Sequence, residues 1–472
     1  MLLSETIVAP AIALNMPSAI GILRVSGDRA FQIMSSLFKK KNKAPFFNDI
    51  DSIKPRYMYH GYLAYSKDSD SIVDEIMICF YKAPYSYTGE DMVEIFSHGG
   101  AYNMQSILKS VISSGARAAE AGEFTKRACI NGKMDLCQAE AILDVINSKT
   151  RPLHDIAISQ VKGILSNEIN QIKMILLEII AEIEANLDFP EDDIAPLNLD
   201  SIDERLRGAL AKTKKLIETY EFGKVIRSGV RLIIVGSPNV GKSSLFNLLL
   251  REERAIVTAI PGTTRDILEE TVNINGIPFS LVDTAGLRQT PDVIEKIGME
   301  RAIKHARKSD IAIIILDSSR VVTNDDVEVL EHVKNIPKIL VINKIDEKSA
   351  EFDSSLEKLG FLNVEKDFII EVSVKENLHI DSLKNLIAKK SGIDCHHFES
   401  SDNVITNARH AAALKRAESS LNDAVLCGAD RNPVDLLTID IRGALSALGE
   451  IVGETLTDDI LHKIFEKFCI GK

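Results

Sequence analysis

One segment limits the fold of this chain more than any other. An apolar run at 232–235 leads into Gly236-Ser-Pro-Asn-Val-Gly-Lys-Ser243, and a second, mostly apolar run follows at 245–250. The pattern G-x-x-x-x-G-K-S between a strand and a helix is the context of a phosphate-binding P-loop, where backbone N–H groups and a helix N-terminus face phosphate oxygens. A chance glycine turn, the alternative, does not account for strand, loop and helix together. The sequence therefore predicts a nucleotide-binding α/β domain with loop contacts from Asn239, Val240, Gly241, Lys242, Ser243 and Ser244.

The segments that follow suit phosphate and magnesium chemistry. Within the P-loop, we expect Lys242 to reach the β and γ phosphates and the Ser243 hydroxyl to hold Mg²⁺. The later segment Gly262-Thr-Thr264 offers a mobile loop in which Thr264 can meet the same magnesium and the γ phosphate. The segment Asp283-Thr-Ala-Gly286 follows a hairpin marked by its Asn275-Gly276 turn, a strong hairpin signal. Its carboxylate suits a position behind the metal's direct ligands, and its glycine N–H suits the γ phosphate.

The choice of base is predicted from Asn343-Lys344-Ile-Asp346, which follows the apolar run 339–342. The Asp346 carboxylate can accept hydrogen bonds from guanine N1–H and the exocyclic amine, whereas adenine presents the wrong edge. N-K-x-D alone arises by chance on helix surfaces, but here it follows the phosphate motifs in order, so GTP is the predicted ligand. Ser373 suits the supporting base loop. The predicted contact set also includes Thr258, Ala259, Ile260, Pro261, Gly262, Thr263, Thr264, Asp283, Thr284, Ala285 and Gly286.

The residue after Gly286 is Leu287, where many signalling GTPases carry a glutamine that orients the attacking water. A leucine side chain neither donates nor accepts a hydrogen bond. Hydrolysis therefore requires another polar residue, an added ion or a partner to stabilise the transition state.

The composition indicates that this domain is part of a larger protein. The 472 residues suggest roughly three domains. Six cysteines lack C-x-x-C spacing, which argues against a zinc site or a disulfide framework and favours a reducing, cytoplasmic location. No run reaches the roughly 18 uncharged apolar residues of a spanning helix, so membrane insertion is not expected. The net charge of −12 disfavours bulk electrostatic coating of nucleic acid, although a local basic patch can still dock RNA.

The order of sequence patterns predicts a multidomain fold with an inserted domain. Residues 1–118 read as an α+β domain, and residues 222–390 alternate strands with helices, as in parallel βαβ units. Residues 119–221 and 391–472 show helical periodicity, and apolar spacing over 153–187 predicts one long helix. The α/β P-loop domain is thus expected to lie within a helical domain built from both flanking segments.

Beyond the nucleotide motifs, the chain resembles the MnmE (TrmE) family of tRNA modification GTPases over essentially its whole length. The resemblance rests on the inserted P-loop domain and on motifs at both ends of the chain. These motifs are Gly21-Ile-Leu-Arg24-Val-Ser-Gly27, Ser86-Tyr-Thr-Gly-Glu-Asp91 through Glu94, His98-Gly-Gly100, Gly122-Glu-Phe-Thr-Lys-Arg127, Asn131-Gly-Lys133-Met-Asp135 and Phe468-Cys469-Ile470-Gly471-Lys472. One departure is Asn15-Met-Pro-Ser-Ala19, where family members often carry a glycine-rich loop.

The resemblance implies a homodimer whose N-terminal domain, residues 1–118, binds 5-formyltetrahydrofolate or a related tetrahydrofolate. By motif position, the folate contacts are Arg24, Glu94, Lys133 and the terminal Lys472. Cationic side chains suit the carboxylates of the glutamate tail, and a carboxylate suits the pterin donors. Ordinary strand or surface pairing is the alternative for Arg24 and Glu94.

The resemblance also implies an answer to the missing glutamine, because the family uses K⁺ and dimerisation of its GTP-binding domains. The potassium positions match Asn239, Thr258, Ile260 and Thr263. Glu295 matches the residue that orients the hydrolytic water through a second water; a solvated helix residue is the alternative. Cys469 lies beside the folate site in the family pattern and is either a participant in modification or a small core residue. The candidate catalytic residues are Glu295, Lys242 and Cys469.

The resulting hypothesis is a potassium-activated GTP hydrolase that modifies the wobble uridine of certain tRNAs, adding a carboxymethylaminomethyl group at C5 with a folate one-carbon unit. The resemblance implies an FAD-dependent partner of the MnmG type in a heterotetramer. The alternative is a ribosome-assembly or regulatory GTPase switch without modification chemistry. The nucleotide motifs fit both, whereas the N-terminal motifs and the Cys-Ile-Gly-Lys end favour the first.

Overall fold

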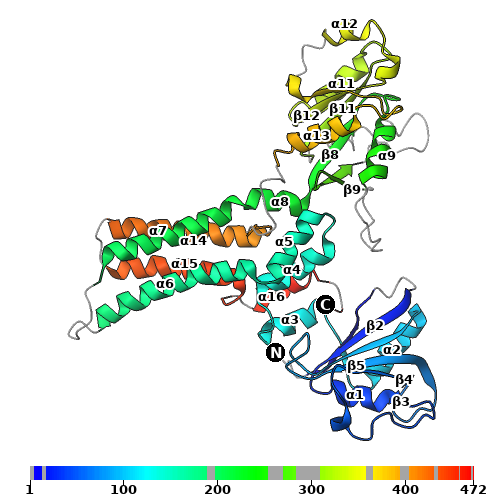
Figure 1. Cartoon of the computed structure of the whole chain (residues 1–472), viewed down its shortest axis with the longest axis vertical. Coiled ribbons are helices and arrows are strands. Elements are labelled where there is room, and N and C mark those ends of the chain that lie inside the picture. Colours follow the sequence, from blue (N-terminus) through cyan, green and yellow to red (C-terminus); the bar gives the residue numbers. More distant parts are fainter. Residues whose placement is uncertain are drawn as a thin grey trace. The chain divides into compact units, whose positions relative to one another are not determined.

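The computed structural model describes residues 5–12, 18–188, 197–253, 269–282, 309–357, 365–393, 403–429, 434–455, 458–468 and 471. Two compact units result (Figure 1). The first combines residues 1–143 with 449–472, and the second holds residues 144–448. The C-terminal end of the chain therefore belongs to the same unit as its beginning.

A seven-stranded sheet forms the centre of the first unit. Its strand order is β3-β4-β5-β6-β2-β1-β7, and every neighbouring pair is antiparallel except β1 with β7. Alternating apolar residues bury one face of such a sheet. The strands are β1 (Ile7–Pro10), β2 (Ser18–Ser26), β3 (Phe38–Lys39), β4 (Met58–Ala64), β5 (Ile72–Tyr81), β6 (Met92–Gly99) and β7 (Arg117–Ala118).

Helices α1 (Ala30–Leu37) and α2 (Ala101–Ser113) supply the other half of this core, with the short helix η1 (Ile50–Ser52) between them in sequence. Met34 and Ile107 are fully buried in one cluster with Phe80 and Ile95 of the sheet. After β7 come α3 (Glu123–Ile130) and α4 (Leu136–Asn147), and α16 (Asp458–Phe465) joins this unit from the C-terminal segment.

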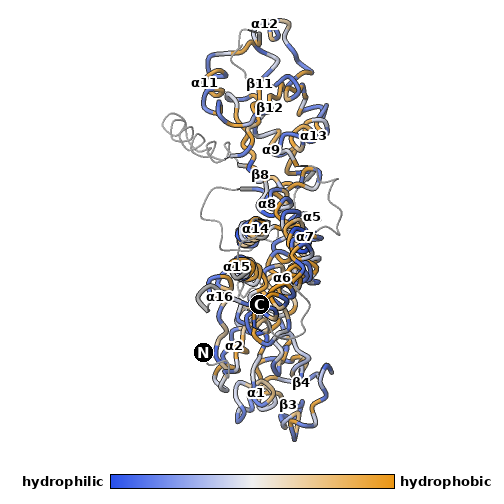
Figure 2. The backbone as a smooth tube through the Cα atoms, turned by 90° about the vertical axis from the view of Figure 1, so that its left-hand side faces the viewer, coloured by the Kyte–Doolittle hydropathy of each residue, from blue (hydrophilic) through white to orange (hydrophobic). Residues whose placement is uncertain are grey.

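The second unit contains a helical bundle built from two stretches of the chain. Figure 1 shows α6, α7, α14 and α15 side by side, and in Figure 2 these helices carry both apolar and polar residues, as amphipathic helices do. The two stretches flank the α/β domain in sequence, so the predicted multidomain fold class is confirmed. The helices are α5 (Arg151–Val161), α6 (Ile164–Asp188), α7 (Leu199–Glu218), α8 (Tyr220–Ser228), α14 (Ala408–Ala429) and α15 (Val434–Val452).

The single long helix predicted over 153–187 is wrong. The chain forms α5 and α6 instead, separated at Gly163, which adopts a φ of 81°. A glycine in this left-handed conformation ends a helix at little cost, and the Gly163 N–H bonds back to the carbonyl of Gln160 at 2.9 Å. Apolar residues are buried on both sides of the corner, so apolar spacing alone does not reveal it.

A six-stranded sheet forms the α/β domain, in the order β13-β12-β11-β8-β10-β9. All neighbouring strands are parallel except β9 with β10, which form the predicted hairpin with positive φ at Asn275 and Gly276. The strands are β8 (Val230–Val235), β9 (Glu269–Ile274), β10 (Ile277–Val282), β11 (Ile311–Asp317), β12 (Lys338–Asn343) and β13 (Ile369–Glu371). The helical segments are α9 (Lys242–Glu253), α11 (Asn324–His332), η2 (Ile345–Glu347), α12 (Phe352–Glu357), η3 (Lys366–Phe368) and α13 (Ile380–Lys390).

The parallel strands bring the nucleotide motifs to one edge of this sheet. Strands β8, β11, β12 and β13 end in the loops that carry the P-loop, Asp317, the Asn343 motif and Ser373. Ligands of open α/β sheets bind at the carboxyl ends of the strands. Motifs that are more than a hundred residues apart in sequence therefore converge there.

None of the described helices combines the length and apolar content that crossing a membrane requires. The predicted domain boundaries at 118, 221 and 390 stay predictions, because the two compact units group the chain more coarsely.

Candidate functional site

The loop after β8 has the backbone of a phosphate-binding turn. Asn239 and Gly241 adopt positive φ angles of 64° and 107°, and α9 starts directly afterwards at Lys242. A Cβ atom on Gly241 would lie 2.3 Å from Nδ2 of Asn343, so only glycine permits this close approach. The turn and the helix N-terminus together form a cradle for an anion.

The ammonium group of Lys242 is held against this loop. Its Nζ donates to the carbonyl oxygens of Gly236 at 2.8 Å and Ser237 at 2.7 Å. The positive charge thus lies beside the turn, where a phosphate oxygen would receive a charge-assisted hydrogen bond. Ser243 lies in the first turn of α9, from which a hydroxyl can reach a cation bound to that phosphate.

Asn343 connects the P-loop to the base-binding side. The residue is 2% exposed. Its Nδ2 donates to the carbonyl of Val240 at 2.9 Å, and its Oδ1 accepts from the N–H of Val374 at 3.1 Å. Both the nitrogen and the oxygen of the side-chain amide are therefore hydrogen-bonded. This predicted contact residue connects the P-loop to the loop that carries Val374.

The Asp346 carboxylate is kept ionised by its neighbours. A hydrogen bond from the Ser373 side chain lowers the pKa of Asp346, and the charges of Lys375 and Lys344 lower it further. Lys375 Nζ lies 4.0 Å from Oδ2 of Asp346. An ionised carboxylate accepts two hydrogen bonds at once, which matches the N1–H and amine edge of guanine.

A large part of the predicted nucleotide site lies outside the described residues. This part comprises the segment 258–264, the segment 283–286 and Glu295. Cys469 and Lys472 at the C-terminus also lie outside them. The described residues bring together Asn239 to Ser244, Asn343 to Asp346 and Ser373.

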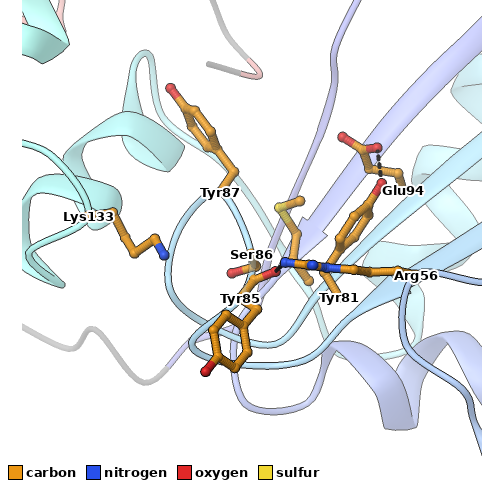
Figure 3. Close-up of a pocket in the computed structure, with 8 residues that line it drawn as sticks. Arg56, Tyr81, Tyr85, Ser86, Tyr87, Glu94 and Lys133 are labelled. Atoms are coloured by element: carbon orange, nitrogen blue, oxygen red, sulfur yellow. Dashed lines mark hydrogen bonds between the residues drawn. The ribbon is translucent and has the colours of Figure 1, made fainter. Parts of the chain in front are cut away.

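A second candidate site lies in the first unit, where β5 ends and β6 begins (Figure 3). It is a cavity of about 410 Å³, which is within the range of small-molecule sites. Aromatic and apolar side chains supply most of the lining, with one acid and two cations among them. The lining residues are Arg56, Tyr81, Tyr85, Ser86, Tyr87, Met92, Glu94 and Lys133.

Two predicted folate contacts, Arg24 and Glu94, form an ion pair across β2 and β6. Nε of Arg24 donates to Oε1 of Glu94 at 2.9 Å, and the two residues are direct partners in the strand register. The other carboxylate oxygen accepts from the Tyr81 hydroxyl at 3.1 Å, the bond drawn in Figure 3. The strand pairing considered as the alternative is therefore present, and it orients a carboxylate that lines the cavity.

A protonated phenol lies beside this carboxylate, and two cations stand elsewhere in the cavity lining. Burial raises the pKa of Tyr81, and Cys79 and Glu94 raise it further, so the phenol stays a donor at neutral pH. Lys133 Nζ donates to the carbonyl of Pro84 at 3.0 Å. Figure 3 shows Lys133 and Arg56 on opposite sides of Tyr85. Such a lining can receive a flat ring with polar edges and a carboxylate.

The chain matches known proteins from end to end. The family model described as the GTP-binding protein TrmE N-terminus matches residues 6–133, and the MnmE helical domain model matches residues 136–469. The tRNA modification GTPase MnmE of Alkaliphilus metalliredigens is 41% identical, and that of Clostridioides difficile is 40% identical, each with 100% of both chains covered. The counterpart from Caldicellulosiruptor saccharolyticus is 43% identical over 96% of each chain.

The chain belongs to the MnmE family of tRNA modification GTPases. It is an enzyme that hydrolyses GTP in tRNA modification. The alternative of an assembly switch without modification chemistry is set aside by this membership.

Several cavity residues of this MnmE-family chain escaped the sequence analysis. Ser86 and Tyr87 belong to the motif Ser86-Tyr-Thr-Gly-Glu-Asp91, so the sequence did contain an indication that they lie at a site. Arg56 carried none, because its place depends on strand pairing. The Arg56 N–H bonds to the Phe80 carbonyl at 2.7 Å, and its guanidinium lies 5.8 Å from the Tyr85 ring centroid. Only the meander of β4, β5 and β6 brings it to the cavity.

A buried charge network supports the turn that carries Tyr85 to Tyr87. Arg127 is 1% exposed. Its guanidinium contacts Glu90 at 3.1 Å and Glu123 at 2.9 Å, and Glu90 also accepts from the Ser26 hydroxyl at 2.8 Å. Because a buried ion costs free energy unless it is paired, these partners fix α3 against the turn.

Proposed function

We propose that this MnmE-family enzyme hydrolyses GTP with Mg²⁺ and is activated by K⁺. Three described features support the proposal: Lys242 held against the P-loop, Ser243 in the first turn of α9, and the ionised carboxylate of Asp346. A hydroxyl at a helix N-terminus that faces phosphate suits Mg²⁺, which prefers oxygen ligands. The amide of Asn239, in the same loop, offers an oxygen that suits a monovalent cation.

Each residue of the proposed site has one task. Backbone N–H groups of 239–244 and Lys242 bind the phosphates, and Asp346 selects guanine. Ser243 and Thr264 would hold Mg²⁺, while Asn239, Thr258, Ile260 and Thr263 would hold K⁺. Glu295 would orient the attacking water, the task for which Leu287 is unsuited. Potassium would supply positive charge near the transferred phosphoryl group, where other GTPases use an arginine.

For the first unit, we propose that the cavity at Glu94 binds 5-formyltetrahydrofolate or a related tetrahydrofolate, which supplies a one-carbon unit. The fit supports this: Glu94 offers an acceptor for pterin N–H groups, the tyrosines offer ring faces, and Lys133 offers a cation for the glutamate tail. Arg24 would act by orienting Glu94. Lys472 and Cys469 belong to the same proposal by motif position.

The proposed reaction adds a carboxymethylaminomethyl group to C5 of the wobble uridine in certain tRNAs. The enzyme would act in the cytoplasm as a homodimer, within a heterotetramer that contains an FAD-dependent partner of the MnmG type. The charge of −12 leaves tRNA binding to local surfaces. GTP hydrolysis would then drive opening and closing of the P-loop domains.

Ion replacement tests the nucleotide half of the proposal. GTP turnover by the purified chain is measured in KCl and in NaCl at equal ionic strength. We expect a rate at least about tenfold higher in K⁺, since a charge at the transferred phosphoryl group contributes strongly to the rate. The variant Asn239→Gly, which keeps the positive φ but removes the amide, should bind GDP and lose the potassium response. Equal rates in the two salts would exclude potassium activation.

Calorimetric titration with 5-formyltetrahydrofolate tests the cavity. We expect saturable binding to the wild type and roughly tenfold weaker binding to Lys133→Ala, because a charge-assisted bond to the ligand is lost. Lys109→Ala, an exposed lysine of α2, is the matched control and should bind as the wild type does. Absence of binding to the wild type would contradict the folate assignment.

A further inference from the structure

A buried contact outside the recognised nucleotide motifs ties the P-loop to α11. The hydroxyl of Ser237 donates to Oδ1 of Asp326, and each residue is 3% exposed. Ser237 lies between β8 and Asn239, whereas Asp326 lies in the first turn of α11, 89 residues later. A hydrogen bond to an ionised group in the protein interior is stronger than a neutral one.

Asp326 is itself held rigidly. Arg320 forms two bonds to its carboxylate, at 3.0 and 3.1 Å, and the N–H and hydroxyl of Thr323 each donate to Oδ2 at 2.9 Å. Burial alone would raise the pKa of Asp326, but the hydrogen bonds from Ser237, Thr323 and Arg320 hold it below its usual value. Ser237 therefore bonds to an acceptor that is ionised and fixed in place.

Ser237 also contacts the lysine that serves the phosphates. Its carbonyl oxygen accepts from Lys242 Nζ at 2.7 Å. One residue thus bonds to Lys242 through its backbone and to Asp326 through its side chain. A shift of Ser237 would move the carbonyl that helps to place the ammonium group.

The segment that runs from β11 to Asp326 also reaches the base-binding side. The Ser318 hydroxyl donates to the carbonyl of Asn343 at 2.9 Å, and Lys344 Nζ donates to Oδ2 of Asp317. The segment 317–326 is therefore bonded to the guanine motif at one end and to the P-loop at the other. It spans the two halves of the nucleotide site without belonging to either motif.

We propose that Asp326 and Ser237 are positioning residues of the GTPase reaction, which hold the P-loop and Lys242 in the nucleotide-binding arrangement. The hydrogen bond between Ser237 and Asp326 joins the P-loop to α11, and neither side chain touches a reacting atom. It therefore favours bound GTP and the transition state equally, so its loss raises KM and leaves kcat nearly unchanged.

The test uses steady-state GTPase kinetics and fluorescent GDP titration of the full chain. Ser237→Ala removes only the hydroxyl and leaves Asp326 with Arg320 and Thr323. We expect KM for GTP and Kd for GDP to rise about tenfold, the typical effect of one hydrogen bond to a charged group, with kcat within about twofold. Asp326→Asn should give the same signature. The double variant should be no weaker than Asp326→Asn, because both changes break one contact.

The matched control is Asp325→Asn, which removes the same charge from the neighbouring, exposed position of α11. It should leave KM and kcat unchanged. A merely structural role would lower the melting temperature and the active fraction, and thus apparent kcat, at constant KM. That outcome for Ser237→Ala, or a KM within twofold of the wild-type value, would overturn the proposal. Ser237→Ala decides the question if Asp326→Asn does not fold.

Discussion

Within the guanine motif, neighbouring residues have different physical tasks. The amide of Asn343 bonds to the Val240 carbonyl through its nitrogen and to the Val374 N–H through its oxygen. Asn343 therefore holds two loops of the site together. Asp346 has an ionised carboxylate whose pKa is lowered first by Ser373. The sequence pattern predicts the presence of both residues, but only the hydrogen bonds separate a scaffold residue from a base-recognising one.

Exchange of the carboxylate at Asp346 for an amide should change base preference. Asp346→Asn replaces one of the two acceptor oxygens by an NH2 group and removes the negative charge from the other, which predicts GTP binding weaker by roughly 100-fold. Fluorescent GDP and GTP competition would measure this. Xanthosine diphosphate, which carries a carbonyl in place of the amine, should bind the variant better than GDP. Unchanged GDP affinity would show that Asp346 does not contact the base.

The Cys129 thiol should be inert at ordinary pH. Burial raises the pKa of Cys129 to about 12, and the charges of Asp135 and Glu140 contribute. A raised pKa keeps the thiol neutral below that value, so at pH 8 its thiolate fraction is roughly 1,000-fold below that of a free cysteine. Iodoacetamide labelling followed by peptide mass spectrometry should modify Cys129 slowly in the native protein and rapidly in guanidinium chloride. Fast native labelling of Cys129 would contradict this, and the rate at Cys469 in the same digest separates a core thiol from a reactive one.

At the scale of elements, short sequence patterns predicted correctly those helices, strands and turns that are determined by neighbouring residues. The strand, glycine loop and helix at 231–250 and the Asn275-Gly276 hairpin are encoded within short windows, and both are found. The break between α5 and α6 at Gly163 was missed because the spacing of apolar residues continues across it without interruption. Arg56 and the contact between Ser237 and Asp326 were missed for another reason: each depends on which strands pair, which no short window contains.

Two glycine-to-alanine changes should have opposite effects on stability. Gly163→Ala forces a side chain into a φ of 81°, which costs about 1–2 kcal/mol. Gly208→Ala lies inside α7, where an added Cβ meets nothing within 4 Å, and should stabilise by about 0.8–1 kcal/mol through helix propensity. Urea unfolding of both variants measures the difference. A stabilising Gly163→Ala would mean that the corner between α5 and α6 is not held in the left-handed conformation.

At the scale of the whole molecule, the order of segments along the chain does not show which segments belong to the same compact unit. The C-terminal segment 449–472 follows the helical bundle in sequence but belongs to the unit of residues 1–143. Phe465 and Phe468 are buried with Leu136 and Ala139. A Cβ on Gly122, just before α3, would lie 2.8 Å from the Phe465 carbonyl, so this close packing requires a glycine. The unit that carries the candidate folate cavity therefore includes this C-terminal segment as well as residues 1–143.

This grouping predicts that a C-terminal core substitution affects one candidate site and not the other. Phe465 is 2% exposed, and Phe465→Ala should cost about 3–5 kcal/mol of stability. Because α3 leads into the turn that carries Lys133, folate affinity should fall, whereas GDP affinity should stay at the wild-type value since Asn239 to Ser244 lie in the other unit. Calorimetry with each ligand on the same preparation measures both. Glu466→Ala, whose side chain is 62% exposed, is the control and should change neither. Loss of GDP binding in Phe465→Ala, with folate binding intact, would show that the C-terminal segment supports the nucleotide site instead.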